Sequence, residues 1–105
     1  MVARLGMAIG LALALIGCGF IRPAPLAQNC AGWLQLGDEA QLVTAEALIE
    51  PWLMDRVRER QQLPPQTPDA QVFGAVVSSI TKVCELERRP DLLLAQVIRD
   101  LYDSG

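Results

Sequence analysis

The three cysteines are the residues of this sequence with the clearest chemistry of their own. Cys18 lies at the end of a long apolar run, whereas Cys30 and Cys84 lie in mixed sequence further along the chain. An odd number of thiols leaves one of them unpaired if all three belong to a single exported domain. Setting Cys18 apart leaves Cys30 and Cys84, which we expect to form a disulfide in an oxidising compartment.

Hydroxyl and carboxylate side chains offer little support for catalysis. Ser78, Ser79 and Thr81 could serve as nucleophiles, but the chain contains no histidine to activate them. The carboxylate pairs Asp38–Glu39 and Glu85–Glu87 lie at predicted helix ends or on polar faces. The sequence also lacks a glycine-rich phosphate loop and a Cys-x-x-Cys pair. We therefore predict a protein that is not an enzyme, with no catalytic residues, no metal ligands and no cofactor.

The amino terminus has the features of an export signal. Arg4 precedes an uncharged run from Leu5 to Ile21 that consists almost wholly of Leu, Ala, Gly, Ile and Met. A secretory signal combines a short basic region, an apolar region and a small-residue cleavage site, which residues 1–17 supply. The alternative is a retained membrane anchor, which needs about 20 apolar residues.

The four residues Leu15-Ile16-Gly17-Cys18 end this run, and they resemble the lipobox of bacterial lipoproteins. That resemblance implies cleavage before Cys18 and lipidation of its thiol, which would anchor the protein to a membrane on the periplasmic side. The alternative is a signal that is cut later, after Ala27, with Pro25 in the position of a small residue.

Charge argues against nucleic acid as a partner. The whole chain has 9 basic and 12 acidic residues. Loss of residues 1–17 removes Arg4 alone, which leaves a net charge of about −4. A mildly acidic chain without a basic patch lacks the electrostatic footprint of a nucleic-acid-binding protein.

The rest of the chain divides into a short tether and a helical domain. Residues 18–29 contain Pro23 and Pro25 and predict a tether, and residues 30–105 show helical periodicity without strand-like alternation. Proline punctuates the helices: Pro51 predicts a kink or a fresh start, while Thr67-Pro68-Asp69 and Pro90-Asp91 each predict a helix start.

Two helices have a clear apolar face. In the longer one, this face consists of Val72, Phe73, Val76, Val77, Ile80, Val83 and Cys84. In the last helix it consists of Leu93, Leu94, Val97, Ile98, Leu101 and Tyr102. The predicted fold class is all-α, a small bundle of four to five short helices with one disulfide.

Two tryptophans are the candidates for contact with a partner. Trp33 and Trp52, the latter followed by Leu53, are either core residues or exposed anchors of a binding surface.

The pattern Cys30-x-x-Trp33-Leu34, then Trp52-Leu53, then Val83-Cys84 and a final helix resembles the HdeA/HdeB family of small periplasmic acid-stress chaperones. The similarity runs from Asn29 to Tyr102. It implies an all-helical fold with a Cys30–Cys84 disulfide, and a homodimer at neutral pH that opens in acid to hold denatured protein clients.

Three functions are consistent with these features. The first is an HdeA-like chaperone of the envelope that holds unfolded clients in acid. The second is a protein that binds one specific partner, such as an immunity protein, at neutral pH. The third is a structural lipoprotein of the envelope.

Overall fold

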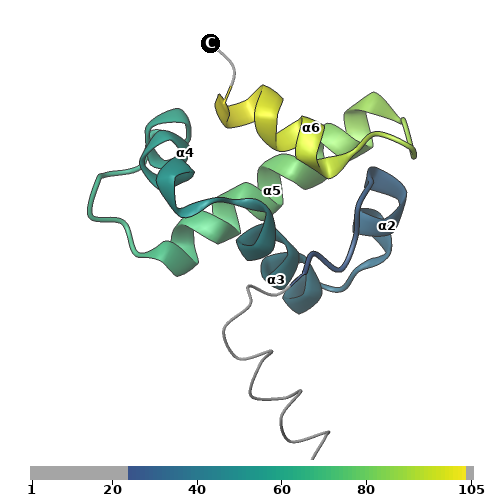
Figure 1. The fold of residues 1–105 in the computed structure, drawn as a ribbon, viewed down its shortest axis with the longest axis horizontal. Coiled ribbons are helices and arrows are strands. Elements are labelled where there is room, and N and C mark those ends of the chain that lie inside the picture. Colours follow the sequence, from purple (N-terminus) through teal and green to yellow (C-terminus); the bar gives the residue numbers. More distant parts are fainter. Residues whose placement is uncertain (1–23, 104–105) are drawn as a thin grey trace, which may run out of the picture.

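The computed structural model describes residues 24–103, and this part of the chain is all-helical (Figure 1). Within it, the only β-type pairing is an isolated bridge between Asn29 and Leu93. The predicted class, a small helical bundle with one disulfide, is confirmed. The elements are α2 (Cys30–Gln35), α3 (Asp38–Leu48), the 3-10 turn η1 (Pro51–Leu53), α4 (Met54–Arg60), α5 (Asp69–Glu87), α6 (Leu94–Ile98) and the π-type turn η2 (Arg99–Asp103).

Helix α5 is the central element, and α2, α3, α4 and α6 all pack against it (Figure 1). It has 19 residues, whereas α2, α4 and α6 have 6, 7 and 5. Isolated helices shorter than about 12 residues are marginal in water, so the short helices depend on packing against α5. The prediction for α5 is confirmed: its buried residues recur every fourth position, at Val72, Val76, Ile80 and Cys84.

The core is a single apolar cluster built around α5. Its largest fully buried side chains are those of Trp33 and Tyr102, which come from opposite ends of the domain sequence. The cluster consists of Ala27, Cys30, Trp33, Ala45, Ile49, Leu53, Val57, Val72, Val76, Ile80, Cys84, Leu94, Val97, Ile98 and Tyr102.

Proline controls the connections, although not always as predicted. Pro51 makes a fresh start, because it opens η1, which leads directly into α4. Pro68 directly precedes α5, as Thr67-Pro68-Asp69 predicted, but the side chain of Thr67 does not cap the helix. The Thr67 hydroxyl donates to the Pro64 carbonyl oxygen at 2.7 Å and so closes the preceding turn instead of capping the helix.

The predicted start of the last helix at Pro90-Asp91 is wrong, because α6 begins at Leu94. The residues before it pair with the chain that enters α2. The Cys30 amide donates to the Leu92 carbonyl oxygen at 2.9 Å, and the Leu94 amide donates to the Gln28 carbonyl oxygen at 2.9 Å. This extended pairing leaves Leu93 56% exposed, although the helical pattern had assigned it to the core.

The last residues of the predicted tether, 18–29, belong to the folded domain. Ala27 is buried in the core, and the Asn29 side chain accepts a hydrogen bond from the Gly32 amide and caps α2. The folded domain therefore begins at about Ala27, before the predicted boundary at Cys30.

The predicted signal, residues 1–17, and Cys18 lie outside the described residues. Among residues 24–103, no helix combines the length and apolar character that crossing a bilayer requires.

Candidate functional site

The disulfide joins α2 to the last turns of α5. Cys30 and Cys84 are bonded with their Cα atoms 5.3 Å apart, and both are buried. The predicted pairing is confirmed, and the bond fixes the entry of the chain into the domain against the central helix.

Trp33 is a core residue. Its side chain is fully buried, and the indole Nε1 donates to Thr81 Oγ1 of α5 at 3.0 Å. The buried Gln41 of α3 donates from Nε2 to the Trp33 carbonyl oxygen at 3.0 Å. Trp33 is thus enclosed by α3 and α5 and cannot contact a partner in this conformation. Thr81, which the sequence offered as a candidate nucleophile, supplies the polar partner of the buried indole.

The other two candidate partner-binding residues are separated by the η1 turn. Leu53 points into the core and is buried, whereas Trp52 is 68% exposed. The structure therefore does not bring Trp33, Trp52 and Leu53 together on one surface. Of the three, Trp52 alone is accessible, because the adjacent residues Trp52 and Leu53 of η1 point in different directions.

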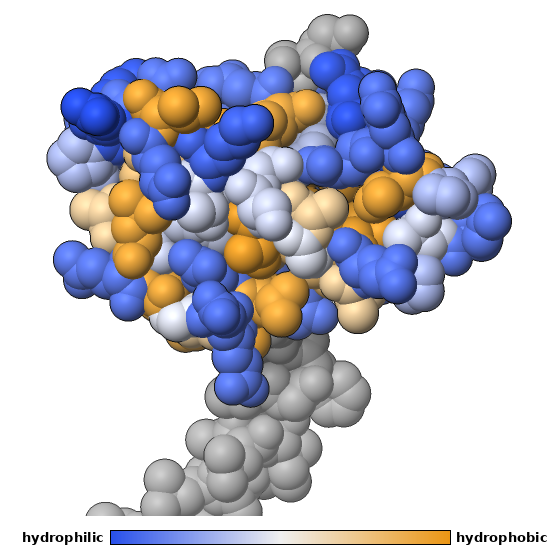
Figure 2. Space-filling view, turned by 180° about the vertical axis from the view of Figure 1, so that it is seen from behind, coloured by the Kyte–Doolittle hydropathy of each residue, from blue (hydrophilic) through white to orange (hydrophobic). Residues whose placement is uncertain are grey.

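The large exposed apolar residues come from different elements and loops of the domain. Figure 2 shows apolar areas on one face that are set apart from one another by hydrophilic residues. The large exposed apolar residues are Leu26, Leu34, Leu42, Trp52, Leu86 and Leu93.

Arg58 of α4 holds the loop that leads to α5, a role that the sequence had not indicated. Its side chain is only 13% exposed. Its Nε and one terminal nitrogen donate to the Thr67 carbonyl oxygen at 3.2 and 3.0 Å. The same terminal nitrogen lies 2.6 Å from Asp69 Oδ1, and the other lies 3.5 Å from Asp55 Oδ1. We call the contacts of Arg58 with Thr67 and Asp69 the Arg58 clamp.

A second polar cluster joins the end of α4 to the end of the chain. Gln61 Nε2 donates to Ser79 Oγ and to the Tyr102 hydroxyl oxygen, both at 2.7 Å. Burial raises the pKa of the Tyr102 hydroxyl above its usual value, although the hydrogen bonds with Gln61 and Ser79 act in the opposite direction. Ser79 is therefore a half-buried residue whose hydroxyl accepts a structural hydrogen bond from Gln61.

The other residues considered for catalysis do not form a site. All five are exposed: Asp38 and Glu39 begin α3, Ser78 lies in the middle of α5, and Glu85 and Glu87 lie at the end of α5. Among residues 24–103, no group of three or more Cys, Asp or Glu side chains is placed to hold a metal ion.

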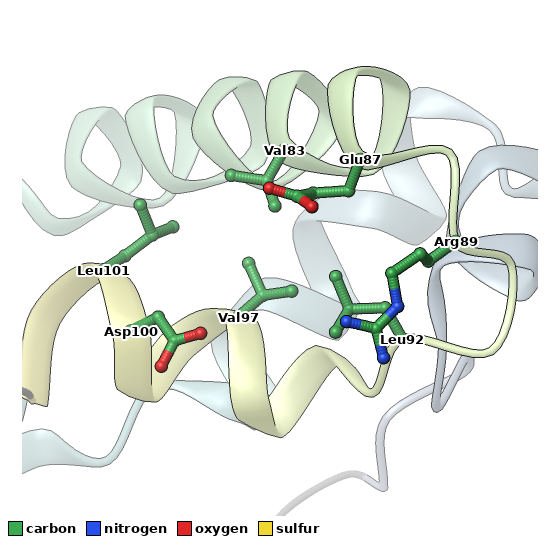
Figure 3. Close-up of a pocket in the computed structure, with 7 residues that line it drawn as sticks. All are labelled: Val83, Glu87, Arg89, Leu92, Val97, Asp100 and Leu101. Carbon is green, nitrogen blue, oxygen red and sulfur yellow. The ribbon is translucent and has the colours of Figure 1, made fainter.

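A groove of about 240 Å³ lies between the carboxyl-terminal half of α5 and the α6–η2 segment (Figure 3). In Figure 3, Val97 and Leu101 point towards α5, the carboxylate of Glu87 lies beside Val83, and the carboxylate of Asp100 lies in front of its own helix. We call this hollow the α5–α6 groove; it is lined by Val83, Glu87, Arg89, Leu92, Val97, Asp100 and Leu101.

Comparison with known proteins finds no match among family models, curated proteins or solved structures.

Proposed function

We propose that this chain is a non-enzymatic protein of the bacterial envelope that binds unfolded proteins in acid. In this proposal residues 1–17 direct export, Cys18 carries a lipid, and the helical domain faces the periplasm. The resemblance to the HdeA/HdeB family motivates the proposal, and the Arg58 clamp is the structural observation that carries it.

On the face in Figure 2, the apolar areas are set apart from one another by hydrophilic residues, whereas fifteen apolar residues of the described chain are buried in the core. In this proposal the client-binding surface comes from partial opening of the domain, which would expose some of these buried side chains. Acid protonates carboxylates, so the segment that opens should be one that carboxylates attach to the rest of the domain.

Helix α4 meets this condition. The ion pair between Arg58 and Asp69 is one of its attachments to α5, and it depends on an ionised carboxylate. Protonation of Asp69 leaves the largely buried guanidinium of Arg58 without its nearest anion. A hydrogen-bonded pair of this kind contributes about 1 kcal/mol, because Asp69 is 72% exposed and water screens the attraction.

The net charge of α4 also favours its release in acid. Within its seven residues, Arg56, Arg58 and Arg60 face only two acidic residues, Asp55 and Glu59. Strong acid neutralises both acids and leaves three cations on two turns, which repel one another. The mature chain as a whole rises from about −4 to about +8.

Release of α4 would expose the apolar side chains that it and its flanking residues bury. Leu53 and Val57 are in the core, and Leu63 packs against it. Gln61 lies between α4 and Leu63, so its hydrogen bonds to Ser79 and Tyr102, which involve no carboxylate, must also break when this segment opens.

The test is binding of an apolar fluorescent dye and suppression of client aggregation, each measured at about pH 2–3 and at pH 7. We expect both to increase in acid. Asp69→Asn removes the anion of the clamp and should move the dye-binding transition to higher pH. Asp91→Asn is the matched control, because Asp91 is also exposed but makes no ion pair with residues 24–103.

No gain in acid over pH 7 would refute the chaperone proposal. Equal transitions in Asp69→Asn and Asp91→Asn would refute the clamp as its trigger. The anchor is tested separately by mass spectrometry of the mature amino terminus, which distinguishes a lipidated Cys18 from cleavage after Ala27 and from a retained anchor.

A further inference from the structure

The α5–α6 groove carries one open charge of each sign beside its apolar lining. The carboxylate of Glu87 lies next to Val83 on the α5 side (Figure 3). The guanidinium of Arg89 lies beside Leu92, away from that carboxylate (Figure 3). The negative and the positive group therefore occupy separate positions along the same hollow.

Neither of these charges is used within the domain. Both residues are exposed, and their side chains make no ion pair or hydrogen bond with any of residues 24–103, including each other. Asp100 also lines the groove, but its Oδ1 accepts a hydrogen bond from Gln96 Nε2 at 2.9 Å, and its carboxylate lies in front of its own helix (Figure 3). Asp100 is thus already engaged, and Glu87 and Arg89 are the charges that a partner can reach.

An exposed leucine lies at the rim of the groove. Leu86 is 71% exposed, the largest exposed fraction among the large apolar residues of the described chain. It follows Val83 by three positions on α5, so the two side chains are neighbours on the helix surface. Because Val83 lines the groove, this face presents a protruding apolar side chain beside a hollow with apolar walls.

The size of the groove limits what it can hold. Its volume of about 240 Å³ lies below the roughly 300–1,000 Å³ of pockets that enclose small molecules. It suits a single side chain presented by another protein.

We propose that the α5–α6 groove is a contact between two copies of this chain, related by a two-fold axis. In such a contact, each residue that meets another across the interface is met by it in return. The Glu87 carboxylate of each copy pairs with the Arg89 guanidinium of the other, so one arrangement satisfies four charges. Leu86 of each copy lies against the apolar lining of the groove in the other.

Other occupants satisfy only part of this surface. A basic side chain would pair with Glu87 and be repelled by Arg89, and an acidic side chain would do the reverse. An apolar side chain alone would remove water from both charges without supplying a partner. A second copy supplies an anion, a cation and a leucine together, because it carries the same surface.

This dimer belongs to the folded domain at neutral pH and needs neither acid nor a client. Its failure would leave the proposed opening of α4 untouched, because no residue of α4 lines the groove. Failure of dye binding in acid would likewise leave the dimer in place.

The test is sedimentation equilibrium of the exported protein at pH 7, in a detergent whose density is matched to that of the buffer. We expect a reversible equilibrium between monomer and dimer. Glu87→Arg and Arg89→Glu should each raise the dissociation constant about 25-fold, because each change removes two symmetry-related ion pairs worth up to about fivefold apiece.

A mixture of these two variants tests the two-fold arrangement itself. One variant carries two cations at these positions and the other carries two anions, so both contacts across the axis become favourable again. Each variant alone should associate weakly, whereas the mixture should form a heterodimer about as stable as the native dimer. Different affinity tags on the two variants, followed by co-purification, detect this heterodimer.

Matched variants separate this site from general surface charge. Glu85→Arg and Arg88→Glu change exposed neighbours that do not line the groove, and they should leave the dissociation constant unchanged. Leu86→Gln should weaken the dimer, whereas Leu42→Gln, which replaces an exposed leucine of α3, should not. Urea unfolding of every variant checks that a weaker dimer does not reflect a lost fold.

Three results would overturn the proposal. The first is a chain that stays monomeric up to about 1 mM protein, including one that uses the same two residues to bind vesicles of zwitterionic phosphatidylethanolamine. The second is equal weakening by the groove variants and their matched controls. The third is failure of the mixed Glu87→Arg and Arg89→Glu chains to associate, because these two residues would then not face each other.

Discussion

Loss of the Cys30–Cys84 disulfide should destabilise this domain severely. The bond closes a loop of about 55 residues, since the two cysteines are 54 positions apart. The chain-entropy model assigns about 4 kcal/mol to a loop of this length, through the restricted unfolded state. A domain of about 80 residues has a free energy of unfolding of only roughly 4–12 kcal/mol. Reduction should therefore lower the melting temperature by about 15–30 °C.

The assay is urea unfolding followed by far-ultraviolet circular dichroism, with and without reductant, in a Cys18→Ser background that contains no third thiol. Reduction of the same chain leaves both sulfur atoms in place, so it isolates the covalent link from changes in core packing. The urea dependence should steepen as well, because the reduced unfolded chain exposes more surface. A loss of less than about 1 kcal/mol, with an unchanged urea dependence, would refute the reasoning.

Two further predictions concern the polar groups of the core. Thr81→Val removes the acceptor of the Trp33 indole and should cost about 1–3 kcal/mol, because the buried donor is left unpaired; Thr81→Ser, which keeps the hydroxyl, should cost clearly less in the same urea assay, and equal losses would contradict this role. Burial raises the pKa of Tyr102, so the free energy of unfolding should fall as pH rises from about 10 through the pKa of the folded state. Tyr102 is the only tyrosine, so tyrosinate absorbance reports its ionisation directly, and a folded-state pKa at or below that of the unfolded chain would contradict the prediction.

The sequence predicted those parts of the fold whose signals are local and periodic. Helix α5 has the strongest apolar repeat, and its buried residues Val72, Val76, Ile80 and Cys84 were all identified. The start of α6 was misplaced because Pro90-Asp91 is a sound local signal for a helix. Hydrogen bonds to Gln28 and Cys30, about 60 residues away, override it, so that residues 90 and 91 form a turn and Leu93 is extended.

The polar contacts could not be predicted for a similar reason. Arg58 lies in the run Arg-Val-Arg-Glu-Arg, where nothing local distinguishes it from Arg56 or Arg60. Its role depends on a turn that brings Thr67 and Asp69 back against α4. Likewise, Trp33 and Trp52 are equivalent as residue types. Their opposite environments follow from partners in other helices and from the direction of the η1 turn.

The position of Cys30 also determines how the domain bears mechanical tension. Cys30 is the first residue of α2, and its bond leads into the last turns of α5. Force applied at the amino-terminal side and resisted at the carboxyl terminus would pass through this covalent bond and bypass residues 31–83. The elements stretched by such a pull are the segment before Cys30 and the chain after Cys84, including α6. A domain held by its amino terminus could thus lose its last helix under load while the rest kept its shape.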